Sequence, residues 1–203
     1  MKSCCESKCD ELALIRDKQK KVLLIVLIIN AVMFFVEFTF GVLSKSTSLL
    51  ADSLDMLGDA SVYAFSLYVL NRSLKWKAGA ALLKGIIINL FGIYVLIEAL
   101  LKIISDVTPV AHTMGVIGLI ALIANAICLF LLLSHKDDDI NMKSTWICSR
   151  NDIIANTGVL IAAFCVSYFQ SKWPDILMGV FIAIVFLRSS IFILKDSIKE
   201  IRL

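Results

Sequence analysis

Polar and apolar residues are segregated along this chain into long blocks. Six of the blocks are apolar, and they cover residues 22–43, 49–70, 78–104, 113–134, 144–169 and 174–194. A helix of about 20 apolar residues crosses the hydrocarbon core of a bilayer, which is about 30 Å thick. The pattern therefore predicts six transmembrane helices joined by short connections.

The overall composition agrees with a helical membrane protein. Of the 203 residues, 59% are hydrophobic and 18% are charged, and the mean hydropathy is +0.87. This is too apolar for a soluble domain of this length. Two prolines, nine glycines and the lack of ten-residue segments with alternating polarity argue against a β-barrel, so we expect an all-α six-helix integral membrane bundle.

The positive charges predict how the bundle is oriented. With six spans, both chain ends and the second and fourth connections lie on one side. That side carries fourteen lysines and arginines against three at the opposite helix ends, and cytoplasmic loops are the ones enriched in these residues. We therefore expect a bacterial inner-membrane protein with a cytoplasmic N-terminal tail at 1–21, a transmembrane domain at 22–194 and a short cytoplasmic tail at 195–203. That last tail is too short to fold alone.

The net charge and the motifs limit which classes of partner are expected. The net charge is +3, and six of the lysines and arginines lie in the first 21 residues, so we expect no nucleic-acid partner. The sequence has no P-loop for ATP. The expected environment is a lipid bilayer, and a secondary transporter is expected rather than an enzyme.

Charged residues inside the predicted spans are the main functional signal. A charge at the centre of a membrane helix costs on the order of 3 kcal/mol on insertion scales. The residues concerned are Glu37, Asp52, Asp55, Asp59, Lys84, Glu98, Arg150, Asp152 and Arg188. For Lys84, Glu98, Arg150 and Arg188, snorkelling or mutual pairing stays an open interpretation because their long stems or end positions allow it.

Three aspartates of the second block share one helix face. At 100° per residue, Asp52, Asp55 and Asp59 fall within about 60° of one another. Carboxylates gathered in a dry place repel one another and need a cation, a proton or both. The face therefore predicts a site that binds cations.

The fifth block supplies matching side chains. Cys148 and Asp152 are four residues apart and share a face, as Asp55 and Asp59 do. Counting about 1.5 Å per residue from the cytoplasmic ends places Asp59 and Asp152 at similar depths near the midplane. Four ligands that include one thiolate suit Zn²⁺, and by softness Co²⁺ or Cd²⁺. Cys148 as a small buried hydrophobe stays an alternative.

Residues 48–60, SLLADSLDMLGDA, resemble the second helix of the cation diffusion facilitator family of divalent-metal/proton antiporters. FFVEFTFG at 34–41 and INMKSTWICSRNDIIANTGVLIAA at 140–163 resemble its first and fifth helices. The resemblance implies a transport site made of two residues four apart on each of helices two and five. The implied ligands are Asp55, Asp59, Cys148 and Asp152. Asp52 and Glu37 would line the access route or support the ligands.

The chain departs from the family pattern at three places. Cys148 stands where the family usually has His or Asp. The usual His-rich stretch before the fifth helix is reduced to His135 and the three aspartates at 137–139. The family's cytoplasmic metal-sensing and dimerising domain has no counterpart in this sequence, so we expect a short form in which any homodimer forms through the membrane helices.

The remaining cysteines fall into two groups. Cys4, Cys5 and Cys9 cluster on the expected cytoplasmic side, where thiols stay reduced. They are interpreted either as a capture site for soft metals or as incidental thiols of the tail. Cys128 and Cys165 lie in apolar blocks and are expected to be packing residues.

The expected activity is export of divalent transition metals in exchange for protons. Zn²⁺ is the first expected cargo, followed by Co²⁺ and Cd²⁺, and no permanently bound cofactor is expected. Metal and protons would compete for the same carboxylates, which couples their movements. A channel for protons or monovalent cations lined by the same acids, and a metal-binding accessory subunit, stay open. A membrane thiol-redox enzyme using Cys148 would leave the three aspartates unexplained.

Overall fold

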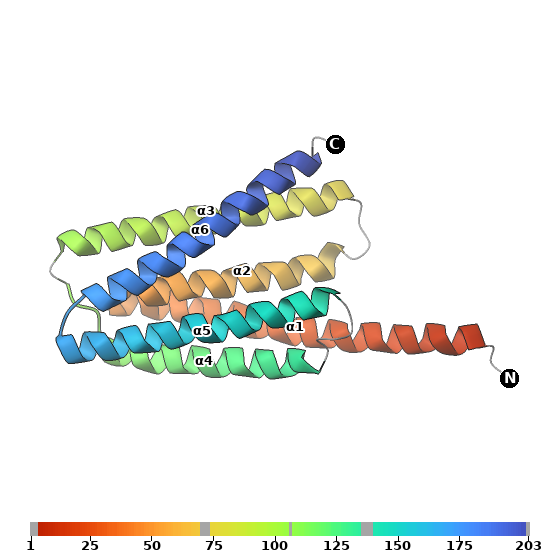
Figure 1. Cartoon of the computed structure of the whole chain (residues 1–203), viewed down its shortest axis with the longest axis horizontal. Coiled ribbons are helices and arrows are strands. Elements are labelled where there is room, and N and C mark those ends of the chain that lie inside the picture. Colours follow the sequence, from red (N-terminus) through yellow and green to blue (C-terminus); the bar gives the residue numbers. More distant parts are fainter. Residues whose placement is uncertain (1–3, 70–73, 106, 135–139, 202–203) are drawn as a thin grey trace.

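The computed structural model is all-helical, as the composition predicts (Figure 1). The structure describes residues 4–69, 74–105, 107–134 and 140–201. Within these ranges, side chains are described at 20–64, 82–83, 85–105, 107–134, 146, 149–150, 152–188, 190–191, 194–195 and 198.

Six helices make up the described chain. They are α1 (Cys4–Ser44), α2 (Thr47–Val69), α3 (Leu74–Ile104), α4 (Ala111–Leu133), α5 (Ile140–Phe169) and α6 (Trp173–Ile201). Each contains one of the apolar blocks to within one residue, so the number and order of helices are confirmed for the described residues, while six membrane crossings stay a prediction. The helices that carry the chain ends extend beyond their blocks, because the polar residues there include many Lys, Glu and Arg, which are good helix formers. Most of the segment expected as a separate tail at 1–21 is thus the first part of α1.

Four of the described helices contain a stretch that is long and apolar enough to cross a membrane. The stretches are Lys20–Ser44, Gly85–Ile104, Ala111–Leu133 and Asp152–Phe169. Large apolar side chains also cover the outside of the bundle, where Phe130 is 71% exposed and Phe164 is 70% exposed. Such an apolar exterior fits lipid.

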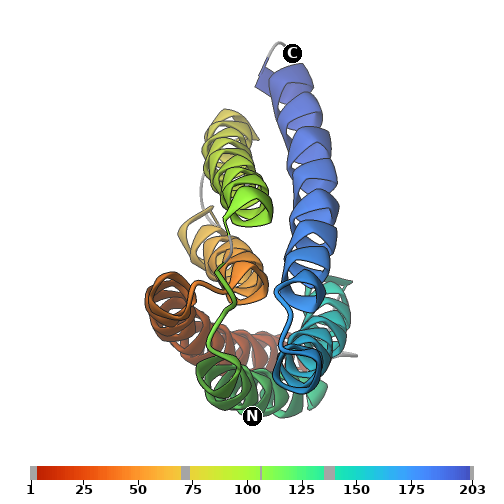
Figure 2. The same cartoon turned by 90° about the vertical axis from the view of Figure 1, so that its left-hand side faces the viewer.

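The helices pack in pairs, with α1 along α2, α4 along α5 and α3 along α6. Seen along the helices, α3 and α6 extend to one side of the bundle, α1, α4 and α5 gather on the other side, and α2 lies between (Figure 2). Both chain ends lie at the same end of the bundle (Figure 1). We call this the terminal end, and the opposite end, which holds the α1–α2 turn, the turn end.

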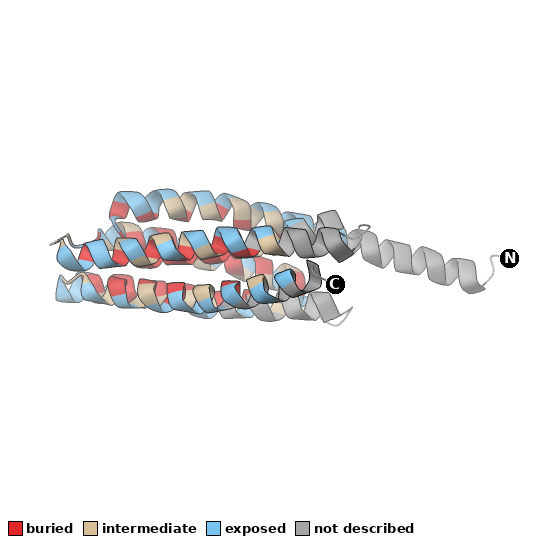
Figure 3. Ribbon diagram, turned by 90° about the horizontal axis from the view of Figure 1, so that it is seen from above, coloured by how far each residue is buried: buried red, intermediate tan, exposed pale blue. Residues whose placement is uncertain are grey.

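Buried positions face inward on each helix (Figure 3). The main core is built by α2 to α6 and contains Leu49, Leu50, Val95, Met114, Ile117, Val159, Val166 and Ile182. A second core contains Cys128 together with Val26, Tyr63 and Leu132. The packing role expected for Cys128 is thus confirmed, and Cys165 is half-buried.

Candidate functional site

The acidic face of α2 meets α5 inside the bundle. Asp52 is fully buried, Asp55 is 8% exposed and Asp59 is half-buried. Asp152 on α5 is 7% exposed, and its side chain lies next to that of Asp55. Asp55 of α2 and Asp152 of α5, one acid from each of the two expected ligand pairs, therefore lie side by side.

Two uncharged residues hold these acids in place. Asn156 Nδ2 donates to Asp52 Oδ1 at 3.3 Å and to the Asp152 carbonyl at 3.1 Å. The Tyr63 hydroxyl donates to Asp59 Oδ2 at 3.0 Å. The sequence analysis did not single out Asn156 or Tyr63. Each lies four residues after an acid, on the same helix face, and this spacing was the signal that could have identified it.

Glu37 adds a further acid from α1. It is fully buried, and Asp52 and Asp55 are its acidic neighbours. Within the described part of the chain, both Glu37 carboxylate oxygens lack a hydrogen-bond partner, as do Asp52 Oδ2 and Asn156 Oδ1. Buried acceptors without donors are rare in proteins and unfavourable. These oxygens therefore provide acceptor capacity for a cation or a proton beside the Asp55–Asp152 contact.

Several predicted site residues fall outside the described side chains. The backbone of α5 places Cys148 one turn before Asp152, but its side chain lies outside the described set, as do those of Cys4, Cys5 and Cys9 on α1. His135 and residues 137–139 lie outside the described residues altogether. Among the side chains that the structure does describe, no three His, Cys, Asp or Glu residues are grouped closely enough to hold a metal ion.

Three of the other charged residues in the spans have local explanations. Glu98 lies next to Tyr94, one turn earlier on its own helix. Arg150 is exposed, and its guanidinium carbon lies 5.6 Å from the centre of the Trp146 ring, which is within cation–π range. Arg188 is exposed. These positions are compatible with the local pairing and snorkelling that the sequence leaves open, and the Lys84 side chain lies outside the described set.

Comparison with known proteins shows the family of this chain. Residues 23–201 match the family model described as the cation efflux transmembrane domain. Over 194 residues, the chain is 30% identical to the cadmium, cobalt and zinc/H(+)-K(+) antiporter of Bacillus subtilis, covering 88% of this chain and 62% of the relative. It is 25% identical over 186 residues to the metal cation efflux system protein CzcD of Cupriavidus metallidurans, covering 86% and 59%.

A zinc transporter is also among the relatives. The chain is 26% identical over 187 residues to the zinc transporter ZitB of Escherichia coli, covering 85% of this chain and 59% of the relative. The chain thus spans less than two thirds of the length of these relatives. The family match covers nearly all of the described helices, and with the apolar helix exteriors it makes this an integral membrane protein. The chain belongs to the cation efflux family, and the matched part is that family's transmembrane domain.

Proposed function

We propose that the protein exports divalent transition-metal cations from the cytoplasm in exchange for protons. Zn²⁺ is the main proposed cargo, with Co²⁺ and Cd²⁺ as further cargoes. The observation that carries the proposal is the contact between Asp55 and Asp152, which joins acids of α2 and α5 inside the bundle. The relatives are named as transporters or efflux proteins for zinc, cadmium and cobalt or for metal cations.

The proposed cargo ligands are Asp55, Asp59, Cys148 and Asp152. Carboxylate oxygen and cysteine sulfur are both zinc ligands, and the sulfur raises affinity for softer ions such as Cd²⁺. The Tyr63 hydroxyl holds one of these carboxylates through its bond to Asp59. Asn156, Asp52 and Glu37 lie beside the ligands. Asn156 bonds to Asp52 and to the backbone carbonyl of Asp152, as supporting partners of metal ligands commonly do.

Coupling follows from the close approach of Asp55 and Asp152. Carboxylates coordinate a divalent cation in their deprotonated form, so the cation and protons compete for the same oxygens. Protons arriving from the opposite side then compete for the same oxygens and release the cation. Exchange of metal for protons at one set of oxygens needs no energy source besides the proton gradient.

The proposed orientation has all six helices crossing the membrane and the terminal end in the cytoplasm. An even number of crossings puts both chain ends on one side, as they are in Figure 1. The excess of lysine and arginine on that side supports a cytoplasmic assignment. Cys4, Cys5 and Cys9 would then lie where they can capture cytoplasmic metal, and a homodimer through the membrane helices remains part of the proposal. The proposed location is a bacterial cytoplasmic membrane.

The test is metal flux through the purified chain in proteoliposomes with an imposed pH gradient. Wild type is expected to show saturable Zn²⁺ flux that depends on the gradient, and Asp55→Ala or Asp152→Ala is expected to abolish it. Thr157→Ala is the matched control, because its exposed hydroxyl bonds only to the carbonyl of Ile153 in its own helix. Cys148→Ser is expected to keep Zn²⁺ flux and to lower Cd²⁺ flux relative to Zn²⁺.

Other results would overturn the proposal in recognisable ways. Wild-type flux in the aspartate variants would refute the site. Conductance without saturable divalent flux would identify a channel for protons or monovalent cations. Absence of flux until a second protein is added would identify an accessory subunit. An unchanged Cd²⁺ to Zn²⁺ ratio in Cys148→Ser would refute sulfur ligation alone.

A further inference from the structure

A single buried carboxylate ties three helices together at the turn end. Asp175, in the first turn of α6, is fully buried. It accepts hydrogen bonds from Ser46 Oγ at 2.7 Å, from the Thr47 amide at 2.8 Å, and from the Ser48 amide at 3.0 Å and Oγ at 2.6 Å. Lys102 Nζ of α3 lies 2.6 Å from the same carboxylate. Every donor bonds to a group that is charged, which makes these contacts strong.

Two backbone features bring α6 close enough to the start of α2 for the Asp175 bonds to form. Lys45 has φ 55 and turns the chain sharply between α1 and α2, which presents the next three residues to α6. Gly179 lies one turn after Asp175, and a Cβ built on it would be 2.6 Å from the Thr47 carbonyl carbon. Only glycine therefore allows α6 to approach the start of α2 this closely.

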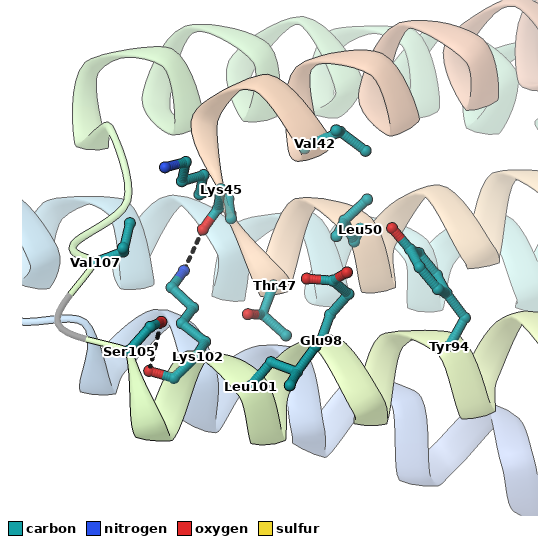
Figure 4. A pocket seen from close by; sticks show the side chains of 12 residues that line it. Val42, Lys45, Thr47, Leu50, Tyr94, Glu98, Leu101, Lys102, Ser105 and Val107 are labelled. Atoms are coloured by element: carbon teal, nitrogen blue, oxygen red, sulfur yellow. Dashed lines mark hydrogen bonds between the residues drawn. The ribbon is translucent and has the colours of Figure 1, made fainter.

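Lys102 connects the carboxylate to the α1–α2 turn from a second direction. Besides Asp175, Lys102 Nζ donates to the Lys45 carbonyl (Figure 4). This contact borders a pocket of about 440 Å³ that Glu98 and Thr47 also line. Lys102 is only 7% exposed, so its charge and that of Asp175 depend on each other for compensation.

The bonds to Asp175 add polar links between helices that also pack on one another, since α2 contacts both α3 and α6. They attach α6 and α3, which pack on each other, to the junction of α1 and α2. At this end α5 and α6 are separated only by a short turn, whereas toward the terminal end α6 diverges from α5 (Figure 1). Motion of the α3–α6 pair relative to the other helices at the turn end would require these bonds to break.

We propose that Asp175 is a positioning residue of the transport cycle that keeps the turn end of the bundle closed. This inference rests on the proposed function, in which the turn end faces the outside. When Asp175 is bonded to Lys102 and to residues 46–48, the cargo site is sealed from the outside. Release of these bonds accompanies the state in which cargo leaves.

The experiment measures which side of the membrane reaches the site. In a variant that keeps Cys148 and replaces the other five cysteines, a membrane-impermeant cationic thiol reagent is added to either face of oriented proteoliposomes. Asp175→Asn is expected to raise the rate of labelling from the outside by on the order of tenfold, because a lost charge-assisted contact shifts a two-state population by about that factor. Ser48→Ala removes one donor to Asp175 and is expected to give a smaller rise in the labelling rate. It replaces Asp175→Asn in the experiment if that variant does not fold.

Lys172→Gln is the matched control. Lys172 also lies at the turn end and bonds to the carbonyls of Ile103 and Ser105, and its replacement is expected to leave labelling from the outside unchanged. A loss of thermal stability in Asp175→Asn with the labelling rates on both faces unchanged would show a purely structural role and overturn the proposal. Labelling does not require cargo flux. If the wild type moves no metal and Asp175→Asn still raises labelling from the outside, the proposed function is refuted and the closure by Asp175 stands.

Discussion

Replacing Gly179 by alanine should separate α6 from the start of α2. The added Cβ would lie 2.6 Å from the Thr47 carbonyl carbon and 2.7 Å from its oxygen, whereas ordinary contact begins at 3.4 Å. Both contacts are with backbone atoms, so no side chain can rotate away. Relief requires α6 to retreat by 0.8 Å, the difference between 3.4 and 2.6 Å.

This retreat would reach the Asp175 carboxylate one turn away. A bond of 2.8 Å to the Thr47 amide would lengthen to 3.6 Å if the displacement were along it, which is beyond a normal hydrogen bond. A hydrogen bond to a charged group contributes about 1.5–3 kcal/mol, and overpacking costs about 1–3 kcal/mol. Alanine recovers about 0.5–1 kcal/mol of backbone entropy. Together these contributions lower the expected free energy of unfolding of Gly179→Ala by about 1.5–5.5 kcal/mol.

Gly115→Ala on α4 is the matched control, because a Cβ there has no neighbour within 4 Å. It makes the same chemical change in a helix without the clash. Thermal unfolding of the detergent-solubilised protein measures both variants. For a chain of this size, Gly179→Ala is expected to lower the midpoint by about 3–22 °C, and Gly115→Ala is expected to leave it unchanged or raise it. Equal midpoints for the two variants would refute the close approach of α6 to α2.

Three further predictions concern the site. Tyr63→Phe removes a hydroxyl bonded to a site carboxylate and should raise the Zn²⁺ concentration for half-maximal flux by about tenfold, whereas Tyr168→Phe, at an exposed position, should not. Asn156→Ala leaves a buried carboxylate oxygen without its donor and should lower the free energy of unfolding by about 1–3 kcal/mol in denaturant titration. Thr157→Ala should lower it by less. Cys128→Ala should lower stability by about 1 kcal/mol and keep the Cd²⁺ to Zn²⁺ flux ratio, and a changed ratio would give that thiol a role in cargo binding.

Much of the acidic cluster can be predicted from the sequence. The spacing of Asp52, Asp55 and Asp59 assigns them to one face because helical geometry is local. The same rule marks Asn156 and Tyr63, which follow acids by four residues. Helix number and order follow from the apolar blocks. The extent of α1 does not, because hydropathy reports where a helix meets lipid and carries no information on where its hydrogen bonds end.

Amino-acid order alone determined that this is a helical membrane protein with carboxylates turned to one side of its second helix. Periodicity and hydropathy act within a few residues, and they need no knowledge of neighbours. Tertiary packing decided which helices meet, and hence that Asp55 touches Asp152 and that Lys102 reaches Asp175. The latter two residues are 73 positions apart, and each looks like an ordinary charge near a helix end. Their pairing depends on the approach of α6 to α2 at Gly179, which arises only when all the helices pack together.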